Sequence, residues 1–438
     1  MFYNIMDSRY LIEALEKWNF WHQDIETGIR RTKYLKEALR LIKVPEIIAY
    51  VGVRRCGKSV LCYQILENLI QSGVPRENTL FVNFEDPVFS ESLSLSELQE
   101  IFNTYLEFKN PKGRIYLFLD EVQKVEDWER FVLALYDSRQ LVKIFVTGSN
   151  SKLLQDRIST LLSGRYLTQK IFPLDFKEFL EFKKIDIVKI SAKARIYHYL
   201  REYLQFGGFP RVVLEKEIII KNSLLQEYYN SIIEKDVILR NNLKNKTEVK
   251  DLALYLMSNI GSLVSTYNLA KKIGIAHQNV IHYLNFFEEA LLIERISKYD
   301  VNVKKQIYNP DKVFVVDTGL SHIAGFSFSE NIGHYLENLV FNEYKARGKR
   351  IYYWKNSAEI DLVIKEGLRV KELVNICYSL RNRAVLDREI RALEEAGAHF
   401  QKAVKRLVFW EKSEEVEAPK EIKMISIDIL SISDLSLS

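Results

Sequence analysis

Hydrophobic residues in the first 170 positions form short continuous runs, separated by stretches with helical spacing. The runs lie at residues 46–51, 79–85, 114–120, 142–148 and 166–171. Apolar residues recur every three or four positions between them, as in 94–108, 128–138 and 151–164. Buried strands that alternate with helices are typical of a parallel sheet covered on both faces. The pattern predicts a five-stranded α/β domain over residues 45–172, preceded by a helical segment at 1–44.

The pattern changes twice after this domain. Residues 173–246 have helical spacing, interrupted by "FGGFPRVV". In 247–317 we expect a helix that begins after Ser265 and ends at Gly274, a second helix, and strands at 292–297, 305–309 and 312–317. This order is typical of a winged helix-turn-helix. Residues 318–438 are predicted to form a further mixed α/β domain.

Composition narrows the class of protein. Of 438 residues, 47% are hydrophobic and 28% are charged, as in globular proteins with several domains. No apolar stretch approaches the roughly 18 residues of a membrane span, and the N-terminus lacks the pattern of a signal peptide. We therefore predict a cytoplasmic protein without a membrane partner. The three cysteines have no metal or disulfide spacing, and the net charge of +5 is too small to identify a partner.

Residues 52–59, "GVRRCGKS", follow the first strand and precede a helix. A glycine-rich loop in this context surrounds phosphate oxygens with backbone N–H groups at a helix N-terminus. Lys58 would contact the β- and γ-phosphates of ATP, and the Ser59 hydroxyl would bind Mg²⁺. The predicted nucleotide-binding residues of the loop are Gly52, Arg55, Cys56, Gly57, Lys58, Ser59 and Val60.

Asp120 and Glu121 end the third strand, at the edge where an open parallel sheet binds its ligand. Asp120 would hold Mg²⁺, and Glu121 would orient and deprotonate the attacking water. The fourth strand ends in Thr147, Ser149 and Asn150, and we favour Ser149 or Asn150 as the residue that senses the γ-phosphate. Either residue could instead only cap the following helix.

Arg165 follows the next helix and would project from the edge of the domain. There it could stabilise γ-phosphate charge in a neighbouring subunit, which would imply a homo-oligomer, or it could be a solvated surface side chain.

The ordered motifs "GVRRCGKS", "LFLDEVQ", "VTGSNSKLL", "SGR", "FPLDFKEF" and "GGFP" resemble those of AAA+ type ATPases of archaea and bacteria whose C-terminal region is a domain of unknown function. The resemblance covers nearly the whole chain. It implies a P-loop core, a helical lid, a winged helix and a C-terminal domain similar to the PD-(D/E)XK nucleases. It also implies that Gly208 and Pro210 lie where the lid meets the nucleotide.

A nuclease of this class needs an acid on a helix, an aspartate at a strand end, and an acid and a lysine two residues apart on the next strand. Glu337 and Asp361 match the first two positions, but Asn375 and Cys377 stand at the last two. Lys371 and Glu372 do not replace them, because adjacent residues of a strand point to opposite faces. We therefore expect a degenerate site without nuclease activity that can still bind a DNA backbone.

In the second helix of the predicted winged helix, Val280, Leu284 and Phe287 would face the core. The outward set would be His277, Gln278, Asn279 and His282, whose side chains can contact phosphates and base edges. Lys271 and Lys272 are the nearby strong cations, and winged helices also serve in protein packing.

Together these features predict an ATP-binding and ATP-hydrolysing protein that couples Mg·ATP turnover to the binding or remodelling of double-stranded DNA. Two alternatives remain open: a nucleotide-controlled switch that acts on a protein partner, and an ATPase that gates a DNA nuclease.

Overall fold

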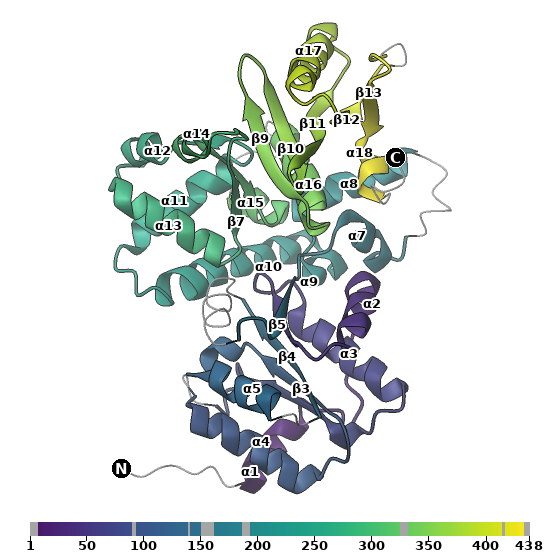
Figure 1. Ribbon diagram of the computed structural model, residues 1–438, viewed down its shortest axis with the longest axis vertical. Helices are drawn as coiled ribbons and strands as arrows, with labels where there is room; N and C mark the ends of the chain where they lie inside the picture. Colours follow the sequence, from purple (N-terminus) through teal and green to yellow (C-terminus); the bar gives the residue numbers. More distant parts are fainter. Residues whose placement is uncertain are drawn as a thin grey trace. The chain divides into compact units, whose positions relative to one another are not determined.

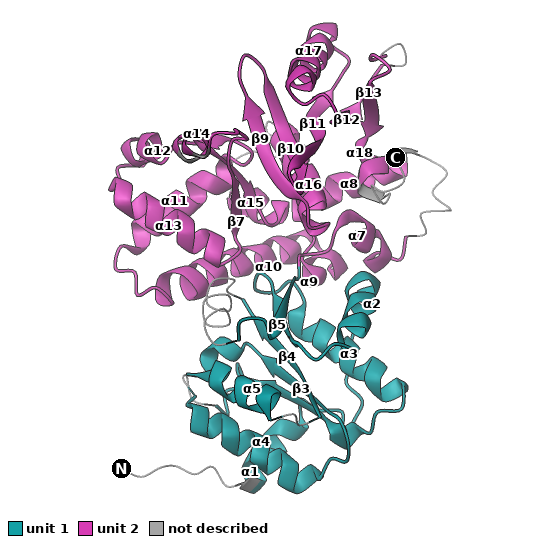
Figure 2. Cartoon of the chain, viewed as in Figure 1, with its two compact units in different colours: residues 1–171 teal, residues 172–438 magenta. Residues whose placement is uncertain are grey.

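The chain folds into two compact units in a computed structural model that describes residues 8–89, 93–138, 141–149, 162–185, 193–324, 332–413 and 417–432. The first unit comprises residues 1–171 and the second residues 172–438 (Figure 2). Among the described residues, no helix has the length and apolar character that crossing a membrane requires.

The first unit is built around a five-stranded parallel sheet with the strand order β2-β3-β4-β1-β5 (Figure 1). The strands are β1 (Ile47–Val51), β2 (Thr79–Asn83), β3 (Ile115–Asp120), β4 (Val142–Gly148) and β5 (Tyr166–Lys170). Every residue of β1 is buried, and β2, β3 and β4 are buried almost throughout. The predicted parallel α/β domain is confirmed, and continuous burial explains why its strands show no alternation of polar and apolar residues.

Helices surround this sheet. They are α1 (Ser8–Glu16), α2 (Thr32–Leu41), α3 (Lys58–Gln71), α4 (Leu95–Lys109) and α5 (Trp128–Asp137), with short 3₁₀ turns η1 (Arg76–Asn78) and η2 (Val122–Lys124). Helix α4 begins with a capping box in which Ser94 and Glu97 satisfy each other's backbone N–H groups. The predicted helix at 151–164 lies almost entirely outside the described residues.

The N-terminal 44 residues are not helical throughout, because residues 17–31 form an irregular segment. Gln64 of α3 holds part of this segment: its Nε2 donates to the carbonyls of Thr27 and Ile29, and its Oε1 accepts from the backbone N–H of Arg31. The Arg31 guanidinium, which is 2% exposed, donates to the Cys56 carbonyl of the phosphate loop. Residues 27–31 therefore act as a strap across α3 and the loop.

The second unit begins with helices α7 (Phe176–Phe182), α8 (Lys193–Phe206), α9 (Pro210–Leu214) and α10 (Ile218–Ser231), and a π-helix, η4 (Ile232–Leu239). The "GGFP" turn lies between α8 and α9. Gly207 has φ +72°, and a Cβ there would come within 1.7 Å of Asp317 Oδ1. Asp317 accepts hydrogen bonds from the N–H groups of Gly208 and Gly319. Gly207 is thus required by packing on Asp317, whereas Gly208 is required by Leu174, whose carbonyl oxygen would lie 2.1 Å from a Cβ there.

A helical group with a small antiparallel sheet follows. It contains α11 (Lys246–Ser258), β6 (Leu263–Val264), α12 (Thr266–Ile273), α13 (His277–Glu289), β7 (Ile293–Ile296), α14 (Val303–Tyr308) and β8 (Asp311–Val315), with the strand order β6-β8-β7. Ser265 caps α12, and Gly274 ends it in the left-handed conformation, as predicted. The predicted strand at 305–309 is wrong: most of it lies in α14, so two strands rather than three follow α13 here.

The rest of the second unit is a mixed five-stranded sheet with the order β13-β12-β11-β10-β9. Its elements are α15 (Thr318–Ala324), α16 (Ile332–Ala346), β9 (Arg350–Lys355), β10 (Glu359–Glu366), β11 (Arg369–Ser379), α17 (Arg383–His399), β12 (Val404–Glu411), β13 (Ile422–Ser426) and α18 (Ile427–Ile432). Strands β9, β10 and β11 pair antiparallel, whereas β11, β12 and β13 pair parallel. Helix α17 packs on the face of the sheet that carries Leu373. On the opposite face, the Tyr344 hydroxyl of α16 donates a hydrogen bond to Glu372.

Candidate functional site

The phosphate loop joins β1 to α3 at the carboxyl edge of the parallel sheet. Gly52 cannot be replaced by a larger residue, because a Cβ there would lie 2.3 Å from the carbonyl oxygen of Ile171 and 2.7 Å from the Cys56 sulfur. Arg55 and Gly57 both have positive φ, +70° and +100°. The loop therefore turns sharply into α3, whose first residue is Lys58.

Lys58 and Glu121 form an ion pair inside this edge. The Lys58 ammonium lies 3.3 Å from Glu121 Oε1 and donates to the carbonyl of Gly52 at 3.0 Å. Burial opposes the charge of Lys58, but Glu121 and Cys56 outweigh it and raise the lysine pKa. The site therefore keeps a buried positive charge beside backbone N–H groups at a helix N-terminus, which suits a phosphate.

Asp120 is held by two hydroxyl groups. Ser59 Oγ donates to its Oδ2 at 2.7 Å, and Thr147 Oγ1 donates to its Oδ1 at 2.5 Å. Burial, with the adjacent charge of Glu121, raises the Asp120 pKa to about 6. A hydroxyl and a carboxylate in contact are oxygen ligands of the kind Mg²⁺ prefers, so Ser59 and Asp120 fit the predicted metal role.

Glu121 has both carboxylate oxygens engaged, Oε1 by Lys58 and Oε2 by the amide of Gln123 at 2.5 Å. Burial alone would raise its pKa, but Lys58 and then Arg54 outweigh burial and lower the pKa to about 2. Glu121 also has φ +54°, which marks a backbone held in a rarely used conformation. Glu121 is therefore an ionised carboxylate in a fixed place beside the lysine.

Thr147 of β4 contacts both acids, because its Oγ1 donates to Asp120 and also accepts from the backbone N–H of Glu121 at 3.0 Å. The γ-phosphate sensor role of Ser149 or Asn150 stays a prediction. Ser149 is fully buried, and Asn150 lies outside the described residues. The sequence assigned no role to Gln123, although it ends the motif "LFLDEVQ", and none to Arg31, which lies outside every motif.

The other residues of the loop take different positions. The Cys56 side chain is fully buried, and burial raises the pKa of its thiol, whereas Val60 and Arg55 are exposed on the loop and α3. Arg54 donates to Glu85 Oε1 at 2.7 Å, just beyond the end of β2. Its positive charge is thereby held near Glu121, although the sequence did not assign it a role.

Arg165 directly precedes β5 and lies at the amino edge of the parallel sheet, opposite to the phosphate loop. It lines a cavity of about 690 Å³ with Lys43, Arg114 and Asp137, and its Nε lies 3.2 Å from Asp137 Oδ1. The two edges of a parallel sheet are separated by the length of the strands, so Arg165 does not belong to the site of its own subunit. A role there requires a second subunit.

Pro210 is the first residue of α9 in the second unit. Its predicted place beside the nucleotide stays a prediction: within the second unit, its motif contacts Asp317 and Leu174.

The surface predicted to read DNA is partly engaged within the protein. His277, Gln278 and His282 are exposed, but Asn279 donates to Glu248 of α11 at 3.2 Å. Asn279 is therefore better explained as a contact between α11 and α13. The predicted core residues Val280, Leu284 and Phe287 are fully buried.

The predicted degenerate nuclease residues are brought together in part. Lys312 of β8 bridges Glu337 and Asp361, and Asn375 accepts from the backbone N–H of Asp361. Cys377 is not part of this group: its thiol bonds the carbonyl of Ser379, and burial raises its pKa. Glu372 is held elsewhere, by hydrogen bonds from Tyr344 and Arg406.

Comparisons with known proteins give two family matches. The AAA domain family matches residues 44–180, and a domain of unknown function, DUF8612, matches residues 197–330. Among solved structures, AMPPCP-bound DnaA from Aquifex aeolicus aligns with 62% of this chain and 92% of that chain, with a TM-score of 0.29 and 17% identity.

Two relatives extend over most of the chain. An uncharacterized protein of Haemophilus influenzae is 34% identical over 345 residues, which cover 77% of this chain and 84% of that protein. The uncharacterized protein MJ1544 of Methanocaldococcus jannaschii is 36% identical over 382 residues, 84% of this chain and 82% of that protein. The chain therefore belongs to the family of MJ1544, with an AAA domain in its first part.

Proposed function

We propose that the protein binds Mg·ATP and hydrolyses its β–γ phosphoanhydride bond. The observation that carries this proposal is the contact chain Lys58–Glu121 and Ser59–Asp120–Thr147, at the carboxyl edge of a parallel sheet and the N-terminus of α3. The AAA domain match covers all of these residues. Few other functions require a buried lysine, a hydroxyl and two acids in this arrangement.

Each side chain has a separate task in this mechanism. Lys58 would bind the β- and γ-phosphates, and Ser59 and Asp120 would hold Mg²⁺, which neutralises phosphate charge when bound. Glu121 would accept a hydrogen bond from the attacking water and orient it. Because its pKa is lowered to about 2, Glu121 is ionised at neutral pH and ready for this role. Thr147 holds the Asp120 carboxylate and the Glu121 backbone in fixed positions through its hydroxyl group.

The experiment that tests the proposal is steady-state ATP hydrolysis by the full chain and by Glu121→Gln, which keeps the shape of the side chain. We expect the wild type to hydrolyse ATP and Glu121→Gln to lose this turnover. Lys58→Ala should lose both turnover and nucleotide binding. If Lys58→Ala bound ATP as tightly as the wild type, the assignment of the phosphate loop would be wrong.

We further propose double-stranded DNA as the partner, through α12 and α13 acting as a winged helix. The exposed His277, Gln278 and His282 on α13, together with the exposed Lys271 and Lys272 on α12, support this choice. Each lysine that contacts a phosphate contributes about one unit to the slope of log affinity against log salt concentration.

DNA binding is tested by the salt dependence of the affinity for a duplex. Lys271→Ala should weaken binding and flatten the slope, whereas Lys402→Ala, at an exposed turn of the same unit, should change neither. If the duplex neither binds through Lys271 nor changes the rate of ATP hydrolysis, a nucleotide-controlled switch acting on a protein becomes the better explanation.

A further inference from the structure

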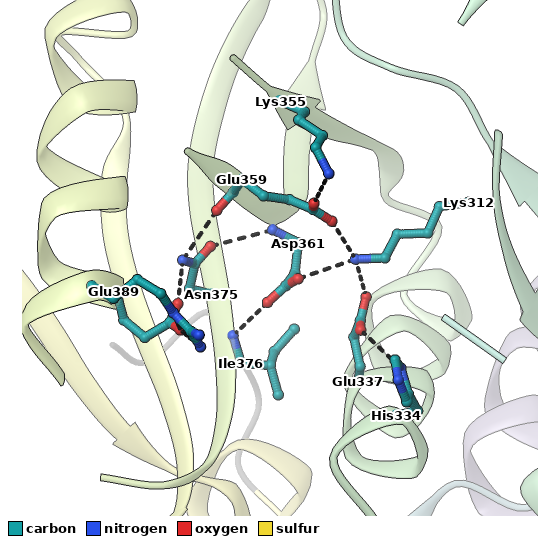
Figure 3. Close-up of polar contacts among 10 residues, drawn as sticks. Lys312, His334, Glu337, Lys355, Glu359, Asp361, Asn375, Ile376 and Glu389 are labelled. Atoms are coloured by element: carbon teal, nitrogen blue, oxygen red, sulfur yellow. Dashed lines mark hydrogen bonds and ion pairs between the residues drawn. The ribbon is translucent and has the colours of Figure 1, made fainter. Parts of the chain in front are cut away.

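Lys312 of β8 is buried among three carboxylates that come from two other elements (Figure 3). Its ammonium lies 2.5 Å from Glu337 Oε1 on α16, 3.1 Å from Asp361 Oδ1 and 3.4 Å from Glu359 Oε1, both on β10. The lysine side chain is only 3% exposed. One positive charge from the small sheet therefore sits at the centre of an acidic group on the C-terminal part of the unit.

A second set of contacts fixes Asp361 on the side away from Lys312. The backbone N–H of Ile376 donates to Asp361 Oδ2 at 2.9 Å, and Asn375 Oδ1 accepts from the Asp361 N–H at 3.2 Å. Asn375 in turn donates to Glu389 of α17 at 2.7 Å. This network (Figure 3) orients Asp361 toward Lys312, so the group is a built site and not a chance cluster on a surface.

The electrostatics of the group agree with this geometry. Burial alone would lower the Lys312 pKa, but Glu337 and Asp361 outweigh burial and raise it well above its usual range. Burial raises the pKa of Glu337 to about 8, against the effect of Lys312. Lys312 is therefore charged, and without it the carboxylates would face one another in a poorly solvated place.

We propose that the ammonium of Lys312 is the resident cation of this carboxylate site and keeps a divalent metal ion out of it. Distances of 2.5 to 3.4 Å suit N–H···O contacts, whereas Mg²⁺ requires oxygen ligands at about 2.0–2.1 Å. With Lys312 among them, Glu337, Glu359 and Asp361 are not arranged to hold a metal ion, and the part of the chain that the structure describes has no other group of three or more His, Cys, Asp or Glu that could. The protein thus supplies its own cation, and this inference does not depend on ATP turnover.

The test counts Mn²⁺ bound to the full chain without nucleotide, by electron paramagnetic resonance. Wild type and Asp361→Asn should bind the same number of Mn²⁺ ions. Lys312→Met keeps most of the apolar stem of the side chain but removes the ammonium, so the position of Nζ is vacated and the acidic side chains should then take up one additional Mn²⁺ per chain. That ion should raise the Tm of Lys312→Met and should be lost again in the double variant Lys312→Met with Asp361→Asn.

Lys355→Met is the matched control, because Lys355 contacts Glu359 from the exposed side at 2.8 Å and does not fill the site. It should bind no additional ion. A folded Lys312→Met variant that gains no Mn²⁺ would overturn the proposal. So would a wild-type Mn²⁺ count that falls on Asp361→Asn, a result that does not depend on whether Lys312→Met folds.

Discussion

Thr147 Oγ1 joins the two acids of the candidate ATPase site: it donates to Asp120 Oδ1 at 2.5 Å and accepts from the backbone N–H of Glu121 at 3.0 Å. One hydroxyl on β4 thus fixes the carboxylate that would hold the metal and the backbone of the residue that would orient water. The relationship explains why a threonine, with both a donor and an acceptor function, stands at this strand end.

Thr147→Val should lower ATP turnover and stability together. Valine has the same shape but leaves the buried Asp120 oxygen and the Glu121 N–H without a partner, at a cost of about 1–3 kcal/mol in the free energy of unfolding. Urea unfolding and steady-state hydrolysis measure the two effects. Thr147→Ser keeps the hydroxyl and should retain most of the turnover; equal losses in both variants would show that the methyl group matters instead.

Glu121→Gln should reduce turnover by about 10²- to 10⁴-fold while ATP binding persists, because a neutral amide cannot accept the proton from water. Removing the negative charge also frees Lys58 from its ion pair, so we expect ATP affinity at least equal to that of the wild type. Fluorescent nucleotide binding and single-turnover hydrolysis separate the two quantities. Unchanged turnover would exclude Glu121 as the base.

Arg165→Ala should lower turnover by about 10³-fold if the arginine stabilises γ-phosphate charge in a neighbouring subunit. Asp137→Ala removes the ion-pair partner of Arg165 and should leave turnover near the wild-type rate. Mixing Arg165→Ala with Glu121→Gln should restore part of the activity, because an intact Glu121 site can then face an intact Arg165. Full turnover by Arg165→Ala alone would show that Arg165 does not act on the nucleotide of a neighbouring subunit.

Asp317 should make the stability of the second unit depend on pH. Burial raises its pKa to about 7, although Gly208 and Gly319 donate to it. Between the unfolded pKa near 4 and the folded pKa near 7, the folded form holds a proton that the unfolded form has lost. The free energy of unfolding therefore falls as pH rises through this range, by at most about 4 kcal/mol, and is flat above it.

The measurement compares urea unfolding of wild type and Asp317→Asn at several pH values, since all other titrating groups cancel in the difference. The stability advantage of the wild type should shrink as pH rises from 4 to 7. A difference that is independent of pH would mean that Asp317 stays ionised in the folded state.

The AAA domain and its candidate nucleotide site could be predicted from the sequence because their signals are local. A strand, a glycine loop and a helix follow one another within about 25 residues, and the acids directly end a strand. The five strands of the first sheet and the buried face of α13 were predicted for the same reason. Helix α14 was misread as a strand because a short apolar run has no clear period.

Contacts between side chains that lie far apart in the sequence could not be predicted. Lys312 is separated from Asp361 by 49 residues, and no spacing rule connects β8 to β10. The hydroxyl of Thr147 that joins the two acids could not be singled out, because side-chain direction at the end of β4 is not set by the alternation of a continuing strand. The fit of Gly207 against Asp317 could not be predicted either, because Asp317 lies about 110 residues later.

The strap at residues 27–31 has a consequence for any attempt to isolate the catalytic part. The AAA domain match begins at residue 44, yet Arg31 and the carbonyls bound by Gln64 lie before it. A fragment cut at residue 44 would lack the carbonyl acceptors of the Gln64 amide and the guanidinium that donates to the Cys56 carbonyl. The recognisable domain is thus shorter than the cooperative folding unit, and a soluble, active fragment has to start upstream of Thr27.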